Sequence, residues 1–221
     1  MSERPTDALV AANAPLWRAA TQHRFVKELG ADTLPDAVFR RYLVQDFAFI
    51  EALANLLGNA VARAPMAAKR RLADFLAGVT GDESDYFERA LAALGAAEAF
   101  EAPHRIARGE TTERFCGLMK AVGERGTYGE MLAIIVAAEW VYLTWACACP
   151  LPRPRRFYLA EWIELHAVQG FADLVEWLRR ELEREGAAAS PRVRDRIGTL
   201  FRATLEFERD FFEAAYGPKP A

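Results

Sequence analysis

Residues 42–50 read Tyr42-Leu43-Val44-Gln45-Asp46-Phe47-Ala48-Phe49-Ile50, and the spacing of their apolar side chains predicts successive turns of one long helix. One apolar side of this helix also carries a carboxylate, and it consists of Tyr42, Asp46, Phe49, Ile50 and Leu53. Burying an unpaired charge costs several kcal/mol. Asp46 is therefore expected either to form an ion pair within the fold or to face a cavity where a ligand supplies its partner.

The composition predicts one domain over residues 1–221. The chain is 52% hydrophobic, its charged residues are mixed along the sequence, and no repeat or low-complexity linker interrupts it. No segment is expected to be apolar for long enough to span a membrane, and Met1-Ser2-Glu3-Arg4 lacks the apolar run of a signal peptide. A cytoplasmic protein without a membrane partner is expected.

Charge and cysteine content exclude two further classes of protein. The formal net charge of −3 predicts no nucleic-acid partner, because binding a polyanion usually needs a clustered basic surface. Three cysteines cannot all pair with one another, and Cys147-Ala148-Cys149 does not have the spacing of a CxxC redox or zinc pair. Reduced thiols in the core or at the surface are expected.

Almost every segment has a helical period, and no stretch has the strict alternation of a strand, so the fold class is expected to be all-α. The expected helices cover residues 6–30, 35–64, 66–94, 111–123, 127–146, 156–185 and 191–216. Gly78 and Gly81 are candidate bends, and Gly170 is a candidate kink. Residues 96–109 are expected to form a loop and residues 149–154 an extended connection. The helix over residues 127–146 is the most apolar, which predicts that it is central.

Four polar residues fall on apolar helix faces: Glu139, Tyr142, His166 and Glu208. A single histidine or tyrosine in such a place is usually a hydrogen-bonded core residue. An inward carboxylate has two readings, a structural ion pair or a functional site. The sequence alone leaves both readings open for Glu139 and Glu208.

Metal and cofactor motifs are missing from the sequence. A di-iron site in a helical bundle needs two Glu-x-x-His pairs, whereas His23, His104 and His166 belong to no such pair. No nucleotide-binding GxxxxGK or GxGxxG sequence follows a strand. A single metal site from Asp46, Glu208 and His166 is geometrically conceivable, but we expect neither a metal nor a cofactor.

Several short motifs occur in a recognisable order. They are His23-Arg24-Phe25-Val26, Thr33-Leu34-Pro35, Phe39-Arg40-Arg41-Tyr42-Leu43-Val44-Gln45-Asp46, Trp140-Val141-Tyr142, Trp162-Ile163 with Phe171 downstream, and Glu208-Arg209-Asp210-Phe211-Phe212. Their order and spacing resemble the TenA/THI-4 family, which includes thiaminase II, over nearly the whole chain. The resemblance implies a single domain with the heme-oxygenase-like multi-helix bundle, and a homo-oligomer, either a tetramer or a dimer.

The resemblance also implies roles for the inward polar residues. Asp46 would hydrogen-bond the amino-pyrimidine of the substrate, Phe49 would stack on its ring, and Tyr142 and Glu208 would complete the pocket. Phe49 and Phe115 stand where the family often has tyrosine, which keeps the stacking and removes a hydroxyl. His166 stands where the thiaminase II branch has tyrosine.

Ala138 is the main departure from the family pattern. The thiaminase II branch has its nucleophilic cysteine two residues before the Trp of Trp-x-Tyr, and an alanine cannot form the covalent intermediate. Cys149 lies about 16 Å further along the helix, and Cys116 lies on another helix. The sequence therefore resembles the branch that lacks this cysteine and uses a pocket glutamate. Glu139 and Glu208 are the candidates, and Glu51 is a third that lies more than a quarter-turn from Asp46 around its helix.

The resemblance therefore implies a thiamin-salvage hydrolase that acts on an amino-pyrimidine, either by removing an amino group or by deformylating a formylaminopyrimidine. Glu208, with Glu139, is the candidate for activating water. Two alternatives stay open: a binding or regulatory protein without catalysis, and an oxygen-dependent or PQQ-synthesis-like member of the same fold.

Overall fold

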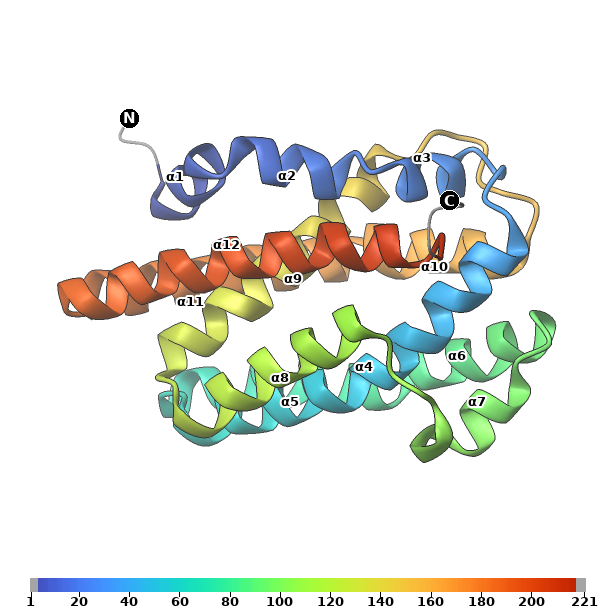
Figure 1. Ribbon diagram of the computed structural model, residues 1–221. Coiled ribbons are helices and arrows are strands. Elements are labelled where there is room, and N and C mark those ends of the chain that lie inside the picture. The colour runs from blue at the N-terminus through green and yellow to red at the C-terminus, as the bar shows by residue number, and fades with distance from the viewer. Residues whose placement is uncertain (1–3, 218–221) are drawn as a thin grey trace.

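The computed structural model describes residues 4–217, apart from the side chains of residues 82 and 83. No strand occurs in this range, so the all-α prediction is confirmed. The elements in Figure 1 are α1 (Pro5–Ala12), α2 (Ala14–Thr21), α3 (Arg24–Gly30), α4 (Asp36–Arg63), α5 (Met66–Thr80), α6 (Asp82–Ala93), α7 (Ala97–Glu101), the 3-10 turn η1 (Pro103–Arg105), α8 (Glu110–Arg125), α9 (Tyr128–Ala148), α10 (Phe157–Ala167), α11 (Gln169–Ala188) and α12 (Pro191–Ala214).

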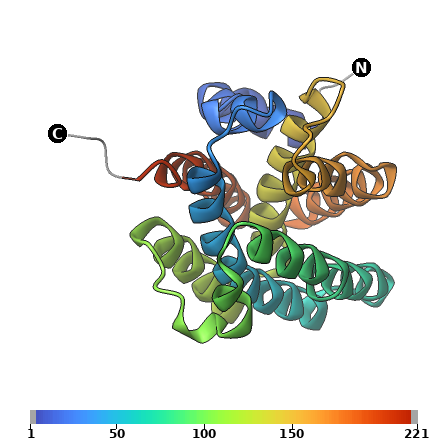
Figure 2. The same ribbon diagram turned by 90° about the vertical axis from the view of Figure 1, so that its right-hand side faces the viewer.

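Helix α9 is the centre of the bundle, as its composition predicted. It packs most extensively against α12 and α11, and also contacts α2, α4, α8 and α10. Figure 2 shows the other helices arranged around it. Every residue from Met131 to Glu139 is buried, which explains why this helix has no polar face.

One expectation about α9 is wrong. The helix Tyr128–Ala148 is long and apolar enough to cross a membrane by length and composition, contrary to the expectation that no segment would be. Within the bundle, however, 67% of its most apolar window is buried against other helices. A central helix surrounded on all sides has the same composition as a membrane helix because both lack a face in water.

Most of the predicted helix ends are confirmed. Thr127 forms a capping box with Glu130, whose carboxylate accepts a 2.7 Å hydrogen bond from the Thr127 amide. The Ser190 hydroxyl accepts a 3.4 Å hydrogen bond from the amide of Val193, with Pro191 in the first turn of α12. Such caps satisfy amides that the first helical turn leaves without partners, and they fix where α9 and α12 begin.

The predicted single helix over residues 6–30 is wrong, because the chain turns twice and forms α1, α2 and α3. At the first turn the side chain of Asn13 donates a 2.9 Å hydrogen bond to the carbonyl of Leu9. At the second, the Nδ1 atom of His23 accepts a hydrogen bond from the amide of Phe25 and caps α3. Side chains that form hydrogen bonds with nearby backbone groups compete with continuation of the helix. The periodicity of apolar residues gives no sign of this competition.

Three other boundaries also differ from expectation. The segment over residues 66–94 divides into two helices at Gly81, one of its two candidate bends, where a Cβ atom would lie 2.9 Å from the carbonyl oxygen of Ala77. The predicted loop over residues 96–109 contains α7 and η1. The break between α10 and α11 falls at Val168, whose extended backbone ends α10, and Gly170 lies inside α11.

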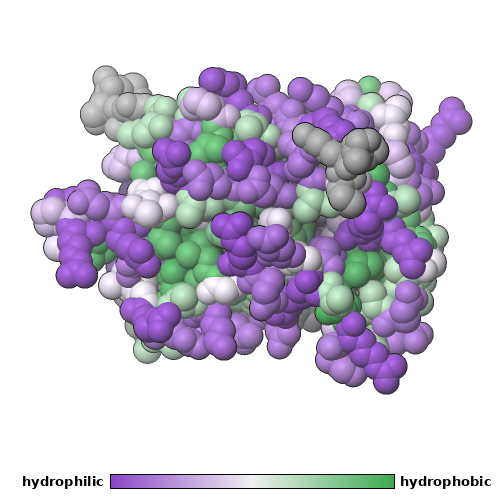
Figure 3. Space-filling view, in the orientation of Figure 1, coloured by the Kyte–Doolittle hydropathy of each residue, from purple (hydrophilic) through white to green (hydrophobic). Residues whose placement is uncertain are grey.

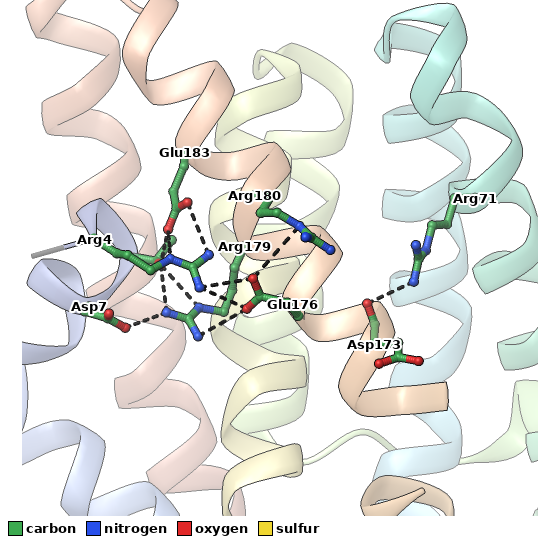
Figure 4. Close-up of polar contacts among 9 residues, drawn as sticks. Arg4, Asp7, Arg71, Asp173, Glu176, Arg179, Arg180 and Glu183 are labelled. Atoms are coloured by element: carbon green, nitrogen blue, oxygen red, sulfur yellow. Dashed lines mark hydrogen bonds and ion pairs between the residues drawn. The ribbon is translucent and has the colours of Figure 1, made fainter. Parts of the chain in front are cut away.

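Helix α11 is held to the first helix by a network of ion pairs (Figure 4). Arg4 contacts Glu176 and Glu183, each at 3.0 Å, and Arg179 contacts Asp7 at 2.5 Å. Isolated surface pairs contribute little, but a network whose members share partners holds its helices in one arrangement more firmly. This network fixes the position of α11, whose first turns form one wall of a mainly apolar cavity.

Candidate active site

A cavity of about 740 Å³ lies between helices α4, α5, α9, α10, α11 and α12. Its size is in the range that small-molecule sites occupy. Its apolar lining includes Phe49, Ile50, Leu53, Phe75, Val79, Trp162, Leu165, Phe171 and Leu174. Its polar lining consists of Asp46, Arg70, Arg71, Asp74, Glu139, Tyr142, His166 and Glu208. This combination of an apolar wall with a few polar groups is typical of ligand sites.

Helix α4 contributes the aspartate side predicted from the sequence. Asp46, Phe49, Ile50 and Leu53 all line the cavity, and only 5% of Asp46 is exposed. A side chain three or four residues further along a helix lies on the same side, so one face of α4 presents both the carboxylate and an aromatic ring. Asp46 therefore faces the cavity.

Helix α12 brings a second carboxylate to the same cavity. Glu208 is 2% exposed and faces inward, whereas Glu206 lies on the outer side and pairs with Arg202 at 3.1 Å. Burial raises the pKa of the Glu208 carboxyl well above its usual range, and the negative charges of Asp46 and Glu139 raise it further. These effects favour the protonated, uncharged form of Glu208.

Helix α9 contributes Ala138, Glu139 and Tyr142. The hydroxyl of Tyr142 lies 2.6 Å from the hydroxyl of Tyr42 on α4. Burial raises the pKa of Tyr142 well above its usual range, so its phenol stays neutral. Glu139 is 8% exposed and is thus a third buried carboxylate beside the cavity.

Helix α10 contributes His166, which is 7% exposed. Its Nδ1 atom lies 2.8 Å from the carbonyl oxygen of Trp162. Because a carbonyl only accepts hydrogen bonds, Nδ1 carries the hydrogen and Nε2 is left as an acceptor in the neutral ring. Burial lowers the pKa of His166 to about 4, so the ring is neutral at pH 7.

Phe115 is the one proposed site residue that the structure keeps off the cavity lining. It lies on α8 behind Phe49, with its ring centroid 4.9 Å from that of Phe49 and 5.0 Å from that of Phe207. Phe115 therefore supports Phe49 from behind, and the sequence periodicity could not separate a lining residue from a supporting one.

No cysteine lines this cavity among residues 4–217. Cys116 lies in a different hollow beside Glu51, Cys149 packs against Gly30, and Cys147 is exposed. Ala138 does line the cavity. Cys116 and Cys149 thus both lie away from the cavity wall that contains Ala138.

The cavity-lining residues that the sequence analysis did not single out come mostly from α5 and α11. Arg71 donates a 2.9 Å hydrogen bond to the carbonyl oxygen of Asp173, which bridges the two helices beside the cavity (Figure 4). Arg70, Asp74 and Phe75 share the same side of α5. Their helical spacing was visible, but nothing in it distinguishes a cavity wall from an ordinary solvated face.

The polar lining suits proton transfer to a small, flat ligand. It offers a neutral carboxyl group, a neutral imidazole with a free acceptor, a phenol and further carboxylates within one largely apolar enclosure. Among the residues that the structure describes, no group of three or more histidine, cysteine, aspartate or glutamate side chains is placed to hold a metal ion.

Residues 10–217 match the model of the TENA/THI-4/PQQC family. The chain belongs to this family. It is 26% identical to the aminopyrimidine aminohydrolase of Halalkalibacterium halodurans, over 93% of this chain and 92% of that protein. It is 25% identical to the aminopyrimidine aminohydrolase of Helicobacter pylori, over 91% of this chain and 93% of that protein.

Solved structures of the family have the same fold. A TenA homologue from Pyrococcus furiosus superposes with a TM-score of 0.85 at 20% identity, covering 96% of this chain and 99% of that one. A TenA homologue from P. horikoshii also gives a TM-score of 0.85, at 22% identity, covering 97% of this chain and 99% of that one. The predicted heme-oxygenase-like bundle is confirmed.

The raised pKa of Glu208 predicts a pH-dependent stability. The folded protein holds this proton to higher pH than the unfolded chain, whose glutamate titrates near 4.5. The contribution of Glu208 to stability is therefore fully present below that pH and is lost as the pH rises toward the folded pKa, by up to about 1.4 kcal/mol per pH unit. Glu208→Gln stays neutral, so its free energy of unfolding relative to the wild type should increase from pH 5 to pH 8 in urea titrations. Glu206→Gln is the matched control, and an equally flat difference for both variants would contradict the assignment.

Proposed function

We propose that the protein is a thiamin-salvage hydrolase that removes an amino group from an amino-pyrimidine. The observation that carries this proposal is the convergence of Asp46, Glu139, Tyr142, His166 and Glu208 on one buried cavity. Two relatives that align with more than nine-tenths of the chain are named aminopyrimidine aminohydrolases, which supports this substrate class.

Substrate binding would use the groups on α4, α9 and α10. Asp46 hydrogen-bonds the amino group of the pyrimidine, and Phe49 stacks on the ring with Phe115 supporting it from behind. The free Nε2 acceptor of His166 and the hydroxyl of Tyr142 orient the remaining polar edge. A flat ring with both donors and acceptors on its edge matches this set.

The hydrolytic step would use two glutamates as acid and base. The oxygen of a water molecule forms a bond to the substrate carbon while the bond from that carbon to the amino nitrogen breaks. Glu208, which burial keeps protonated, gives its proton to the leaving nitrogen. Glu139 accepts a proton from the attacking water, so that the products are the hydroxylated pyrimidine and ammonia. The same pair could serve the deformylation of a formylaminopyrimidine, where water attacks the formyl carbon.

Turnover measurements test this assignment. Glu208→Gln should lower kcat for ammonia release from an amino-pyrimidine by about 10²-fold to 10⁴-fold, the usual contribution of a general acid. Asp46→Asn should mainly raise KM. Glu206→Gln lies on the outer side of the same helix and should match the wild type. Wild-type turnover by Glu208→Gln would refute its role. Tight binding of the pyrimidine by the wild type without any product would instead favour the non-catalytic alternative.

Ala138 generates a gain-of-function prediction. It lines the cavity beside Glu139, at the position where the thiaminase II branch of the family has its cysteine. Ala138→Cys should therefore acquire measurable cleavage of thiamin through a covalent thiolate intermediate, which the wild type cannot form. Release of the thiazole fragment by chromatography and a covalent adduct by mass spectrometry would test it. Ala138→Ser, which has a weaker nucleophile at the same atom, is the control and should form no adduct.

We also propose that the protein forms a homo-oligomer, as the family resemblance implies. Large apolar side chains stand on its surface, since Met66 is 80% exposed, Leu151 79% and Val168 50%. Figure 3 shows several separate apolar patches among the hydrophilic side chains of one face, one of them in the seam below α12. Light scattering after gel filtration should give the mass of a dimer or tetramer, and the mass of a single 24.7 kDa chain would contradict the proposal.

A further inference from the structure

The cavity has a mouth that carries arginines and a buried part that carries carboxyl groups. The lining residues that are exposed to solvent mark the mouth between α5 and the junction of α10 with α11, and they are Ala67, Arg70, Asp74, Val168 and Gly170. Arg71 lies half-buried on the same helix as three of them. Asp46, Glu139 and Glu208, each less than a tenth exposed, lie in the buried part. The two parts of one enclosure therefore favour opposite charges.

Arg71 is held across this mouth by partners that carry no charge. Its guanidinium donates a 2.9 Å hydrogen bond to the backbone carbonyl oxygen of Asp173 and lies 5.3 Å from the ring centroid of Trp177. Figure 4 shows the side chain extending from α5 toward the first turns of α11. Within the described part of the chain, Arg71 forms no ion pair with a carboxylate. A guanidinium has five N–H donors, so several of them remain for a further acceptor.

The other charges at the mouth do not neutralise Arg71. Arg70 and Asp74 lie four residues apart on α5 and pair with each other at 3.8 Å, so their charges largely cancel. The carboxylate of Asp173 accepts a 2.8 Å hydrogen bond from Gln169 instead of pairing with Arg71. A half-buried cation attracts an anion more strongly than a fully solvated one, because less water screens its charge.

We propose that Arg71 binds an anionic substituent of the ligand at the mouth of the cavity. The inference rests on the proposed function and narrows its substrate class to amino-pyrimidines that carry a phosphate or carboxylate tail. Both groups can accept two parallel hydrogen bonds from one guanidinium. The carboxyl groups of the buried part would repel such a tail, so the tail points outward and the pyrimidine ring points inward toward Asp46 and Phe49.

The cavity has room for a ring together with a tail. Its volume of about 740 Å³ lies in the upper half of the range of about 300–1,000 Å³ that small-molecule sites occupy, and a pyrimidine with short substituents fills only part of it. Phe75 lies one turn after Arg71 on α5, and Leu174 follows Asp173 on α11; both line the cavity. A short apolar spacer between ring and anion would therefore have apolar contacts next to the charge.

Equilibrium binding of matched amino-pyrimidines tests the proposal. Two series carry a short tail either on the ring carbon between the two nitrogens or on the exocyclic amino arm, and in each series the tail ends in a hydroxyl, a carboxylate or a phosphate. In at least one series the wild type should bind an anionic member about 10-fold to 100-fold more tightly than the hydroxyl member, the effect of a charge-assisted pair of hydrogen bonds. The order of carboxylate and phosphate identifies the preferred anion. No preference for an anionic tail in either series would overturn the proposal.

Substitutions separate recognition of charge from the bridge that Arg71 forms between α5 and α11. Arg71→Gln keeps an amide donor and loses the charge, so it should lose the preference for an anionic tail and keep the wild-type affinity for the hydroxyl member. Arg71→Lys should retain only part of the preference, because it keeps the charge without the guanidinium fork. Arg114→Gln is the matched control, since Arg114 is an exposed arginine of α8 away from the cavity lining, and it should bind every ligand as the wild type does.

Two outcomes of these substitutions would contradict the role of Arg71. Equal losses of affinity for the hydroxyl and anionic members in Arg71→Gln would indicate a purely structural bridge and overturn the proposal. If Arg71→Gln does not fold, Arg71→Lys decides, because the full wild-type preference in a variant without the fork would overturn the proposal as well.

Turnover of the same ligands distinguishes this inference from the proposed function. Turnover of the hydroxyl member with no preference for an anionic tail would refute only the role of Arg71. Preferential binding of an anionic member without any product would support the role of Arg71 and refute the hydrolase. Absence of both binding and turnover for every member would refute the proposed function, and the role of Arg71 with it.

Discussion

The desolvation of carboxylates inside an aromatic core is the constraint on which the site depends. Asp46, Glu139 and Glu208 each come from a different long helix and are each less than a tenth exposed. Like charges this close to one another, and this far from water, cannot all be present without a large cost in free energy. The fold reduces that cost by favouring a protonated Glu208, whose pKa is raised by burial and by the other two carboxylates. The electrostatic repulsion that would destabilise a plain core thus favours the protonated form of Glu208, which the proposed mechanism uses as its proton donor.

Helix α9 makes this arrangement possible because it serves both the core and the site. Its residues Met131 to Ala137 are buried against helices on every side and hold α4, α11 and α12 at fixed distances. One turn later the same helix presents Ala138, Glu139 and Tyr142 to the cavity. A rigid, fully packed helix is a precise support for polar groups, since its side chains cannot shift without opening voids. Trp140, on another side of α9, packs against Trp17 with a ring-centroid distance of 4.9 Å and receives the guanidinium of Arg179 at 3.8 Å, which ties α9 to the network on α11.

Helical periodicity was enough to predict the inward side chains of Asp46, Glu208 and Tyr142, because each lies in a long amphipathic or apolar helix. It failed where local chemistry decides the outcome: Asn13 and His23 end helices through bonds to nearby backbone, which a period cannot reveal. It also failed where tertiary contacts decide it. Tyr42 and Tyr142 are 100 residues apart, so their hydrogen bond depends on how α4 and α9 are rotated about their axes. The same limit explains Arg71, whose bond to Asp173 depends on the approach of α5 to α11.

The alanine at position 138 has a consequence for the proposed chemistry. Its side chain lines the cavity beside Glu139, in a wall that also includes Tyr142 and Glu208. A methyl group there occupies less space than a cysteine side chain, and a water molecule needs room together with at least two polar partners. In the proposed mechanism the neighbouring carboxylates provide such partners, so that water is bound and deprotonated where the family resemblance would place a thiolate. In that mechanism a solvent nucleophile therefore replaces the protein nucleophile of the thiaminase II branch. This replacement demands a proton acceptor next to the water and a separate donor for the leaving nitrogen. The pairing of Glu139 with a neutral Glu208 meets both demands, whereas two ionised carboxylates would supply no donor.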